Sequence, residues 1–529
     1  MRTVSPEIWW GRRKKSPISS NFGQKVPNKM ETMLRRSFWK TLEEFSRTTH
    51  MTGFKYTVDE MASAAKRKMW RYLVFTFIIM GLVTTGFIVH RLRQLPAVTV
   101  ALPSLEHTIQ NIDFPAVAFC SYNLINKTRA WDYAEFLHSK KHRFRRWYKN
   151  YSVEDIYKNL VNFGALIDFS LPSIDIDFTE FLQAVDGDRG MNVTAVMLML
   201  TAPCSEQLLH CNWRGRPHDC SELFALRLTQ TGFCCIFNGR YQEGDRLNKP
   251  YRLDTVGADN GLSVIVHTAR DDDAYLRWTG VGTEVILFNG AEYPLMEGGG
   301  ILAVPAAVNE STFLLLSTAE VDAPSDVHDV SEARRGCKFG KPGETYIQCL
   351  TECRRKTIET LCGCVPFQYM PAEGDTLCRL EQLPCLNKYR EKLLFYFPKD
   401  TDFDPGLQEE FSDSLDCYFC LPDCTRTRYT IDVSVAKYGF LRGHLPFFNY
   451  FTYKRRVVNS SIVRLFYSTE GQTLYSLEVT ERWYELTSII GGQCCMIFGI
   501  TIMLGPEIIY HLTIRWKHHF DILKRRQAI

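Results

Sequence analysis

The chain has 529 residues, a formal net charge of +4, and 45% hydrophobic residues. This length allows two or three domains, and so small a net charge gives no indication of a nucleic-acid or other polyanionic partner. The apolar residues are concentrated in two stretches, which directs attention to a membrane.

Residues 1–69 are rich in Lys and Arg and precede the first apolar stretch. We predict a membrane-spanning helix over residues 70–90, because residues 73–89 carry no charged side chain and about 20 such residues cross the hydrocarbon. The stretch lies too far from the N-terminus, and is flanked by too much charge, to be a signal peptide. The alternative is a buried helix in a soluble core.

Residues 91–485 form the segment between the two apolar stretches, and they contain no repeat or low-complexity tract. Short alternating apolar runs predict strands, and two longer stretches have helical periodicity. The fold class expected for this segment is therefore α+β. The predicted strands are 97–101, 116–119, 262–267, 284–288 and 429–435, and the predicted helices are 151–163 and 346–361.

Two features place this segment outside the cell. N-glycosylation sequons occur between the apolar stretches and not in the tails. Of the 18 cysteines, 16 also fall there, and an even, dense set in an extracellular segment predicts disulfides. The sequons begin at Asn126, Asn150, Asn192, Asn309 and Asn459.

Two motifs in this segment have alternative interpretations. The C-x-x-C from Cys417 to Cys420 resembles a zinc or redox motif, but no second knuckle or thioredoxin-like pattern accompanies it, and we expect no metal site. The run Arg143-Phe144-Arg145-Arg146 matches a furin-type cleavage site. It can equally be the solvated face of a basic helix.

The second apolar stretch predicts a different kind of membrane helix over residues 486–512, followed by a basic tail, 513–529. Its polar side chains are costly to expose to lipid, and its glycines gain nothing there. Both are tolerated where a helix faces protein or water. We therefore predict that this second helix lines a pore. Basic residues precede the first span and follow the second, and such residues favour the cytoplasmic side. We therefore predict that both termini are cytoplasmic and that the chain is a multi-pass plasma-membrane protein.

Three motifs resemble the degenerin and epithelial sodium channel family, which includes acid-sensing channels. Residues 114–120 read FPAVAFC, similar to the family's FPAVTxCN, and residues 232–238 read GFCCIFN, similar to its G-x-C-x-x-F-N. In the second span, GGQ at 491–493, the triplet 499–501 and Glu507 resemble its GGQ, G-x-S and Glu. The doubled cysteine at 234–235 is most like the insect pickpocket branch.

This resemblance implies a trimeric channel with two transmembrane helices and an ectodomain of palm, β-ball, finger, thumb and knuckle, the thumb being about 330–425. It implies Na⁺ as the permeant ion and block by amiloride. It also implies most of the disulfides, and Cys204 with Cys235 is then paired by elimination. The pairs are Cys120–Cys234, Cys211–Cys220, Cys337–Cys424, Cys349–Cys420, Cys353–Cys417, Cys362–Cys385 and Cys364–Cys378.

The resemblance also assigns roles in the pore. Gly499, Ile500 and Thr501 correspond to the selectivity filter, although Thr501 stands where the family has Ser. Gly499 could instead serve helix packing alone. Glu507 could pair with Lys517 or His511 rather than attract cations. The residues expected to support the pore helix are Gly491, Gly492, Gln493 and Glu507.

Two further departures concern gating. The family carries a His-Gly pair before its first span, and here Thr52-Gly53 takes that place, with His50 as the nearest histidine. Gly53 is thus a candidate gating residue. Gly505-Pro506 inside the second span is also unusual, because Pro can kink a helix.

The function expected is a subunit of a sodium channel, sensitive to amiloride and gated by an extracellular ligand, protons or force. The alternatives are an auxiliary subunit without its own pore and a membrane-anchored receptor. Catalytic motifs such as H-E-x-x-H are missing from the sequence, so no enzyme is expected. The partners expected are the lipid bilayer, subunits of the same family in a homo- or heterotrimer, and an extracellular ligand of unknown identity; no cofactor is expected beyond permeant Na⁺.

Overall fold

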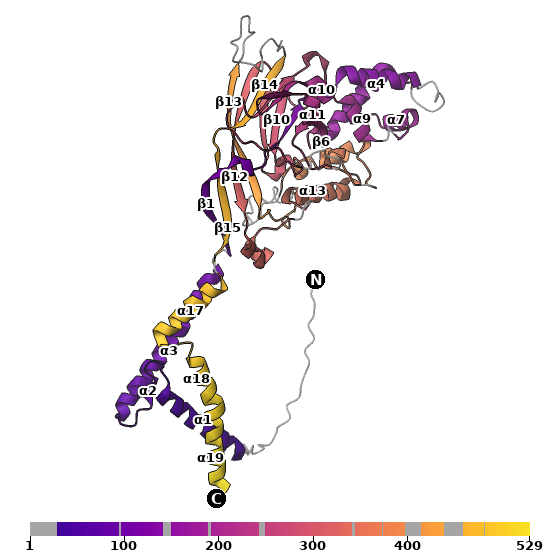
Figure 1. The fold of residues 1–529 in the computed structure, drawn as a ribbon. Coiled ribbons are helices and arrows are strands. Elements are labelled where there is room, and N and C mark those ends of the chain that lie inside the picture. The colour runs from indigo at the N-terminus through magenta and orange to yellow at the C-terminus, as the bar shows by residue number, and fades with distance from the viewer. Residues whose placement is uncertain are drawn as a thin grey trace, which may run out of the picture. The chain divides into compact units, whose positions relative to one another are not determined.

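The computed structural model describes residues 29–94, 97–140, 150–188, 192–242, 249–340, 344–372, 374–396, 414–437, 459–480 and 482–528. The chain divides into two compact units (Figure 1). Residues 96–480 form the larger unit, and residues 1–95 with 481–529 form the smaller one. These bounds lie close to the predicted limits of the segment between the spans.

The larger unit is built on two sheets. The first has the order β1-β15-β12-β14-β8-β4-β5, with β13 also paired to β12, and the second has the order β11-β10-β2-β7-β6. Strand β3 pairs with β9 separately. The strands are β1 Val98–Thr108, β2 Ala116–Ser121, β3 Asn123–Asn126, β4 Leu208–Trp213, β5 Arg216–His218, β6 Phe224–Thr229, β7 Gly232–Phe237, β8 Leu262–His267, β9 Asp273–Leu276, β10 Gly282–Phe288, β11 Leu302–Ala307, β12 Glu310–Asp322, β13 Arg426–Lys437, β14 Ser460–Tyr467 and β15 Gly471–Val479.

Strand β12 is the centre of the first sheet. Along most of its length every second residue is buried, as expected for a strand with one face on the core. It pairs antiparallel with β13 along one edge, and parallel with β14 and then β15 along the other. One long strand therefore connects most of this sheet.

Helices cover one side of the larger unit, and in Figure 1 α4, α7 and α9 lie on the side away from β1 and β13. Local signals set their ends: Ser152 and Asp155 form a capping box at the start of α5, and Thr345 caps α13. The helices are α4 Lys127–Lys140, α5 Val153–Val161, α6 Ala165–Asp168, α7 Asp177–Asp186, α9 Val193–Leu200, α10 Cys204–Gln207, α11 Cys220–Leu223, α12 Glu332–Arg335, α13 Tyr346–Cys362, α14 Leu383–Lys388 and α15 Arg390–Leu394.

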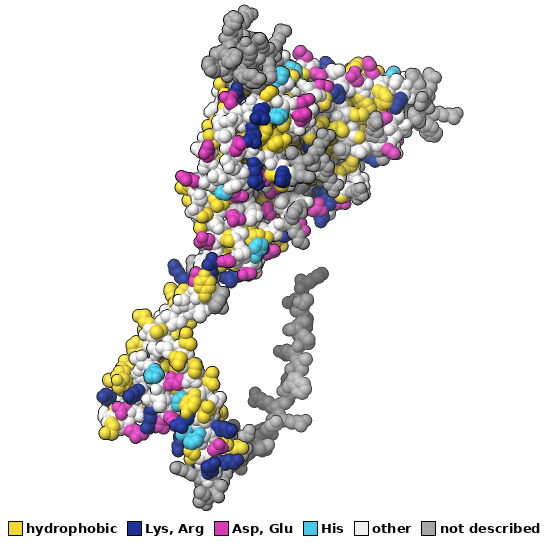
Figure 2. Space-filling model, in the orientation of Figure 1, with side chains coloured by type: hydrophobic (Ala, Val, Ile, Leu, Met, Phe, Trp, Pro, Cys, Tyr) yellow, Lys and Arg dark blue, Asp and Glu magenta, His cyan; other side chains and the backbone are white. Residues whose placement is uncertain are grey.

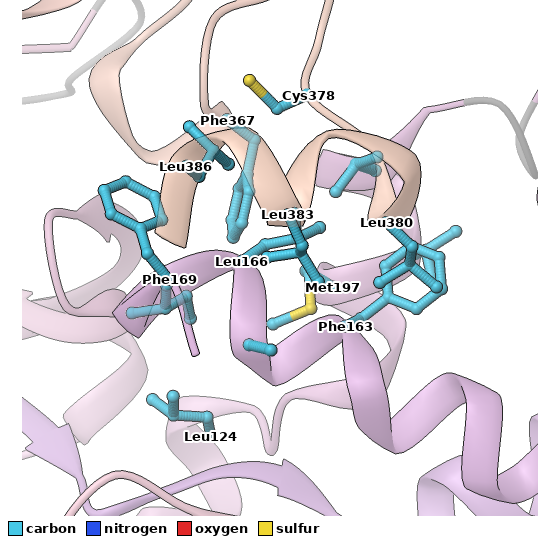
Figure 3. Close-up of a cluster of buried hydrophobic side chains, with 14 of the residues drawn as sticks. Leu124, Phe163, Leu166, Phe169, Met197, Phe367, Cys378, Leu380, Leu383 and Leu386 are labelled. Atoms are coloured by element: carbon cyan, nitrogen blue, oxygen red, sulfur yellow. The ribbon is translucent and has the colours of Figure 1, made fainter. Parts of the chain in front are cut away.

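Apolar packing joins the helices of residues 127–200 to the segment that follows α13. Figure 3 shows Phe367 and Leu383 extending toward Leu166 and Met197. All four side chains are essentially buried. A second core lies between the two sheets and includes Phe114, Phe237 and Tyr467. Because burial of each such side chain contributes roughly 1.5–3 kcal/mol, these cores hold the larger unit together.

Eight disulfides staple the larger unit, and they are the eight pairs stated above. Cys349 and Cys353, one turn apart on α13, bond to Cys420 and Cys417 in the returning chain. Both cysteines of the C-x-x-C are thus in disulfides, which removes the zinc and redox alternatives. Cys494 and Cys495 are free.

The described secondary structure of the smaller unit consists of helices joined by short loops. One of its helices, over Ala64–Arg91, is long and apolar enough to cross a membrane by length and composition, in the described part of the chain. It includes residues 70–90, where the sequence predicts the first membrane-spanning helix, and the crossing of a membrane stays a prediction. The helices are α1 Lys29–Thr48, α2 Phe54–Thr57, α3 Ala64–Gln94, α17 Trp483–Phe498, α18 Leu504–Tyr510, a π-helix at His511–Arg515, and α19 Trp516–Ala528.

The stretch predicted as the second membrane helix, residues 486–512, is divided into two helices in the structure. Helix α17 ends at Phe498 and α18 begins at Leu504, so the second apolar stretch is interrupted. Pro506 lies in the first turn of α18, where a missing backbone N–H removes no helical hydrogen bond. Proline is therefore not the cause of the interruption.

Candidate functional site

The interruption of the second apolar stretch begins at Gly499. Its backbone lies in the left-handed region, with φ +65° and ψ +26°, and its N–H donates to the Cys495 carbonyl over 2.8 Å. This geometry is a common helix ending that glycine adopts without a Cβ penalty. Gly499 therefore ends α17, so its role in the structure goes beyond the helix packing that the sequence left as an alternative.

Helical hydrogen bonding resumes two residues later. The Leu504 N–H donates to the Thr501 carbonyl over 3.0 Å. The carbonyls of Gly499 and Ile500 between these points receive no backbone hydrogen bond from any described residue. Backbone oxygens that are free of a helix can replace the water shell of a permeating ion.

A segment from the opposite end of the chain closes on this break. The Thr52 N–H donates to the Phe498 carbonyl over 3.0 Å. A Cβ built on Gly499 would lie 2.8 Å from the Thr52 hydroxyl oxygen. Gly53 follows with φ +85° and starts α2. The structure thus brings the candidate gating residue beside the candidate filter.

Thr52 itself was missed as a candidate site residue. The available signal was its position directly before Gly53, where the resembling family has His. Nothing in the sequence indicates that its amide reaches Phe498.

Close packing also holds α17 against α3. A Cβ on Gly81 of α3 would lie 2.9 Å from the Phe498 ring, so a larger residue there would require this ring to move. Gly491 and Gly492 on α17 face open space within this chain, since nothing lies within 4 Å of a Cβ at either position. The Gln493 side-chain oxygen is buried without a partner in the structure.

Comparison with known proteins decides the family. Residues 45–511 match the family model described as amiloride-sensitive sodium channel. The chain belongs to this family of ion channels. Membership rules out neither a conducting nor an auxiliary role, but it makes the chain a channel protein rather than an enzyme or an unrelated receptor.

Individual relatives agree with this assignment. Sodium channel protein Nach of Drosophila melanogaster is 22% identical, over 91% of this chain and 89% of the relative. Pickpocket protein 19 of Drosophila melanogaster is 22% identical, over 84% of this chain and 86% of the relative. The human bile acid-sensitive ion channel is 20% identical, over 91% and 88%.

Below the break, the N- and C-terminal helices of this channel chain are clamped together. The Glu44 carboxylate of α1 accepts from the Arg515 guanidinium and lies 2.7 Å from Nε2 of His519. The Ser37 hydroxyl donates to the Trp516 carbonyl over 3.1 Å. Burial, followed by the positive charges of Arg515 and Lys40, lowers the pKa of His519.

The alternative partners of Glu507 are not seen. Among the described residues Glu507 forms no ion pair, and His511 instead places Nε2 3.3 Å from the Thr48 hydroxyl and packs on Phe45.

The larger unit carries a pocket of about 530 Å³ beside the first turns of α13. Glu292 and Glu344 are among the residues that line it. Burial, and then the nearby charge of Asp423, raises the pKa of Glu292 to about 7. This carboxyl therefore titrates close to neutral pH. Among the described residues no cluster of three or more His, Cys, Asp or Glu is placed to hold a metal ion.

The sequons differ in accessibility. Asn126 is only 8% exposed, and its side-chain oxygen accepts from the Arg129 N–H at the start of α4. Asn150 and Asn192 are exposed, while Asn309 and Asn459 are partly exposed. The structure thus argues against Asn126 as a glycan site. The candidate cleavage run Arg143–Arg146 lies outside the described residues.

Proposed function

We propose that the chain is a subunit of a plasma-membrane sodium channel that is blocked by amiloride and opened by an extracellular ligand, protons or force. The single observation that carries the proposal is the helix break at Gly499, held by the Thr52 amide. A membrane segment that only anchored the protein would gain nothing from such a break, since freed backbone groups are costly in lipid.

The ion pathway in this proposal runs past the break. The carbonyls of Gly499 and Ile500, which receive no backbone hydrogen bond from the described residues, supply oxygen ligands, and the exposed Thr501 adds a hydroxyl. Glu507 concentrates cations at the inner mouth by its charge. The extra methyl of Thr501, relative to Ser, is expected to narrow this part of the pore.

We further propose a trimer with both termini in the cytoplasm, assembled from identical or related subunits. Gly491 and Gly492 support this assembly, because each leaves open space where a neighbouring helix can approach closely. The basic residues that flank the two spans support the orientation. The sequons and disulfides, confined to the segment between the spans, support an extracellular larger unit.

Within that unit we assign palm, β-ball, finger, thumb and knuckle domains, as in the family resemblance. The first sheet fits the palm, the second sheet the β-ball, and α13 with its disulfides the thumb. The bridges of Cys349 and Cys353 make α13 a stiff lever. A stiff lever can carry a ligand-induced or mechanical displacement toward the membrane segments.

The auxiliary role is the second candidate, and one observation favours it. Two residues at the break depart from the family pattern, Thr52 standing where the family has His and Thr501 where it has Ser. Such a chain would assemble with conducting subunits and contribute the contacts of Glu44 with Arg515 and His519, without forming a pore alone.

Voltage-clamp recording from cells that express this chain alone tests the proposal. We expect an inward current that disappears when external Na⁺ is replaced by a large organic cation and that is blocked by amiloride. Surface labelling provides the control for expression. Silence of a chain that reaches the surface would refute autonomous conduction, and recovery of current with a related subunit would then establish the auxiliary role.

A further inference from the structure

Helix α1 carries an apolar surface that the described residues cover only in part, since Phe38 packs edge-on against Trp516 but stays exposed elsewhere. Leu34, Phe38 and Leu42 follow one another at one-turn spacing, and Trp39 extends the same arc. Phe38 is 41% exposed and Trp39 is 57% exposed. We call these four residues the apolar arc of α1. The buried Ser37 and Thr41 lie on the adjoining face, which packs against α19.

Positive charge borders the apolar arc. Arg35 lies within the arc and Arg36 beside it, and neither forms an ion pair with a described residue. Lys40 is exposed on the polar side of the helix. Figure 2 shows hydrophobic side chains over the helices of the smaller unit, with Lys and Arg gathered near its lower ends. A cationic flank beside exposed Trp, Phe and Leu is the pattern of a helix that lies in a membrane interface.

The contacts of α1 keep it beside the membrane-spanning helices. At its C-terminal end the Thr48 hydroxyl meets His511, and a few residues later the Thr52 amide bonds to Phe498. Glu44 is held by Arg515 and His519. These contacts hold α1 beside the end of the second apolar stretch. If that stretch spans the membrane as proposed, its end lies where hydrocarbon gives way to headgroups.

We propose that α1 is an interfacial helix, with its apolar arc inserted between anionic phospholipids and with Arg35, Arg36 and Lys40 on their headgroups. A bilayer, rather than another protein, is the occupant, because the arc belongs to the same unit as α3 and its cationic border complements anionic lipid. The assignment of α1 to the inner leaflet rests on the topology proposed above. The contact between α1 and lipid does not depend on which leaflet it is.

Photocrosslinking of the full-length chain in lipid nanodiscs tests this proposal. Benzoylphenylalanine replaces Trp39 in one variant and the exposed Arg47, which lies further round on the polar side of the same helix, in the matched control. Discs contain phosphatidylcholine alone or with phosphatidylserine, and mass spectrometry identifies the adducts. Both variants must retain the gel-filtration profile of the unmodified chain.

We expect lipid adducts at position 39 and not at position 47, with more adduct in phosphatidylserine discs. The R35Q/R36Q pair on the position-39 background should lower the preference for phosphatidylserine, by about five-fold for each cation removed. Equal adducts at both positions, equal adducts in both lipids, or crosslinks from position 39 to a second copy of the chain would each overturn the proposal. Discs carry the same lipid in both leaflets, so a wrong topology or a silent channel would not affect the result.

Discussion

The contact between Gly499 and Thr52 gives a prediction whose size can be worked out from the structure. Substitution Gly499→Ala places a side chain at φ +65°, which costs roughly 1–2 kcal/mol for an L-residue. The new Cβ would also lie 2.8 Å from the Thr52 hydroxyl oxygen, which is closer than a van der Waals contact. Thr52 must then move, and its hydrogen bond to Phe498 is weakened at a cost of about 1 kcal/mol.

The two costs together amount to about 2–3 kcal/mol, which is a factor of roughly 30 to 150 in the equilibrium that maintains the break. If the break forms the pore, current per surface channel should fall by at least about ten-fold in Gly499→Ala. The assay is whole-cell current divided by surface protein. Gly86→Ala in α3 is the matched control, because its Cβ meets nothing within 4 Å.

A second substitution separates the two costs. Thr52→Ala removes the hydroxyl that the new Cβ would meet, so the double variant should recover the steric part, about five-fold in current, and retain the backbone part. Wild-type current in Gly499→Ala, or strictly additive effects of the two substitutions, would refute the reasoning.

Three further predictions concern the larger unit. Asn126→Gln should leave the electrophoretic mobility of the chain unchanged, because Asn126 is buried and caps α4. Asn150→Gln should instead remove one glycan. A mobility shift for Asn126→Gln would contradict the structure. Arg354→Ala should destabilise the larger unit by roughly 3–5 kcal/mol, because it leaves the partly buried Glu297, 2.7 Å away, without its charge partner. Thermal unfolding measures this loss, and Lys356→Ala at an exposed position should unfold close to wild type. Because the pKa of Glu292 is raised from 4.5 to about 7 in the folded state, the folded form binds the extra proton, so stability should fall as pH rises from about 4.5 to 7. In Glu292→Gln this change of stability with pH, up to about 3 kcal/mol, should disappear. The measurement is unfolding at several pH values, with Glu222→Gln at an exposed position as the control. The same pH dependence in both variants would contradict the prediction.

Local patterns were enough to predict much of the larger unit. The apolar alternation at 262–267 became β8 with the same bounds, and the predicted helix from Tyr346 became α13, since strand and helix periodicity is a property of neighbouring residues. Disulfide connectivity was different. Sixteen cysteines allow a very large number of pairings, so the pairs came from the family resemblance and not from spacing.

The candidate site was predictable only in part. Gly499 and Thr501 could be singled out, and glycine at 499 indicated a place where the backbone can leave the helix. The extent of the break, from Gly499 to Met503, could not be predicted, because the apolar stretch around it is continuous in the sequence. The hydrogen bond from Thr52 to Phe498 joins residues from opposite ends of the chain, and no local pattern indicates such a contact. The burial of Asn126 was hidden for the same reason, since a sequon carries no information on packing.

The central claim is that the break between α17 and α18 lines a cation pathway. Its most direct test is thiol modification during recording, with Thr501→Cys introduced on a C494S/C495S background. We predict that a small cationic methanethiosulfonate reagent abolishes the Na⁺ current of Thr501→Cys and leaves that of a Gly86→Cys control unchanged. Full current after complete modification of Thr501→Cys would contradict the account.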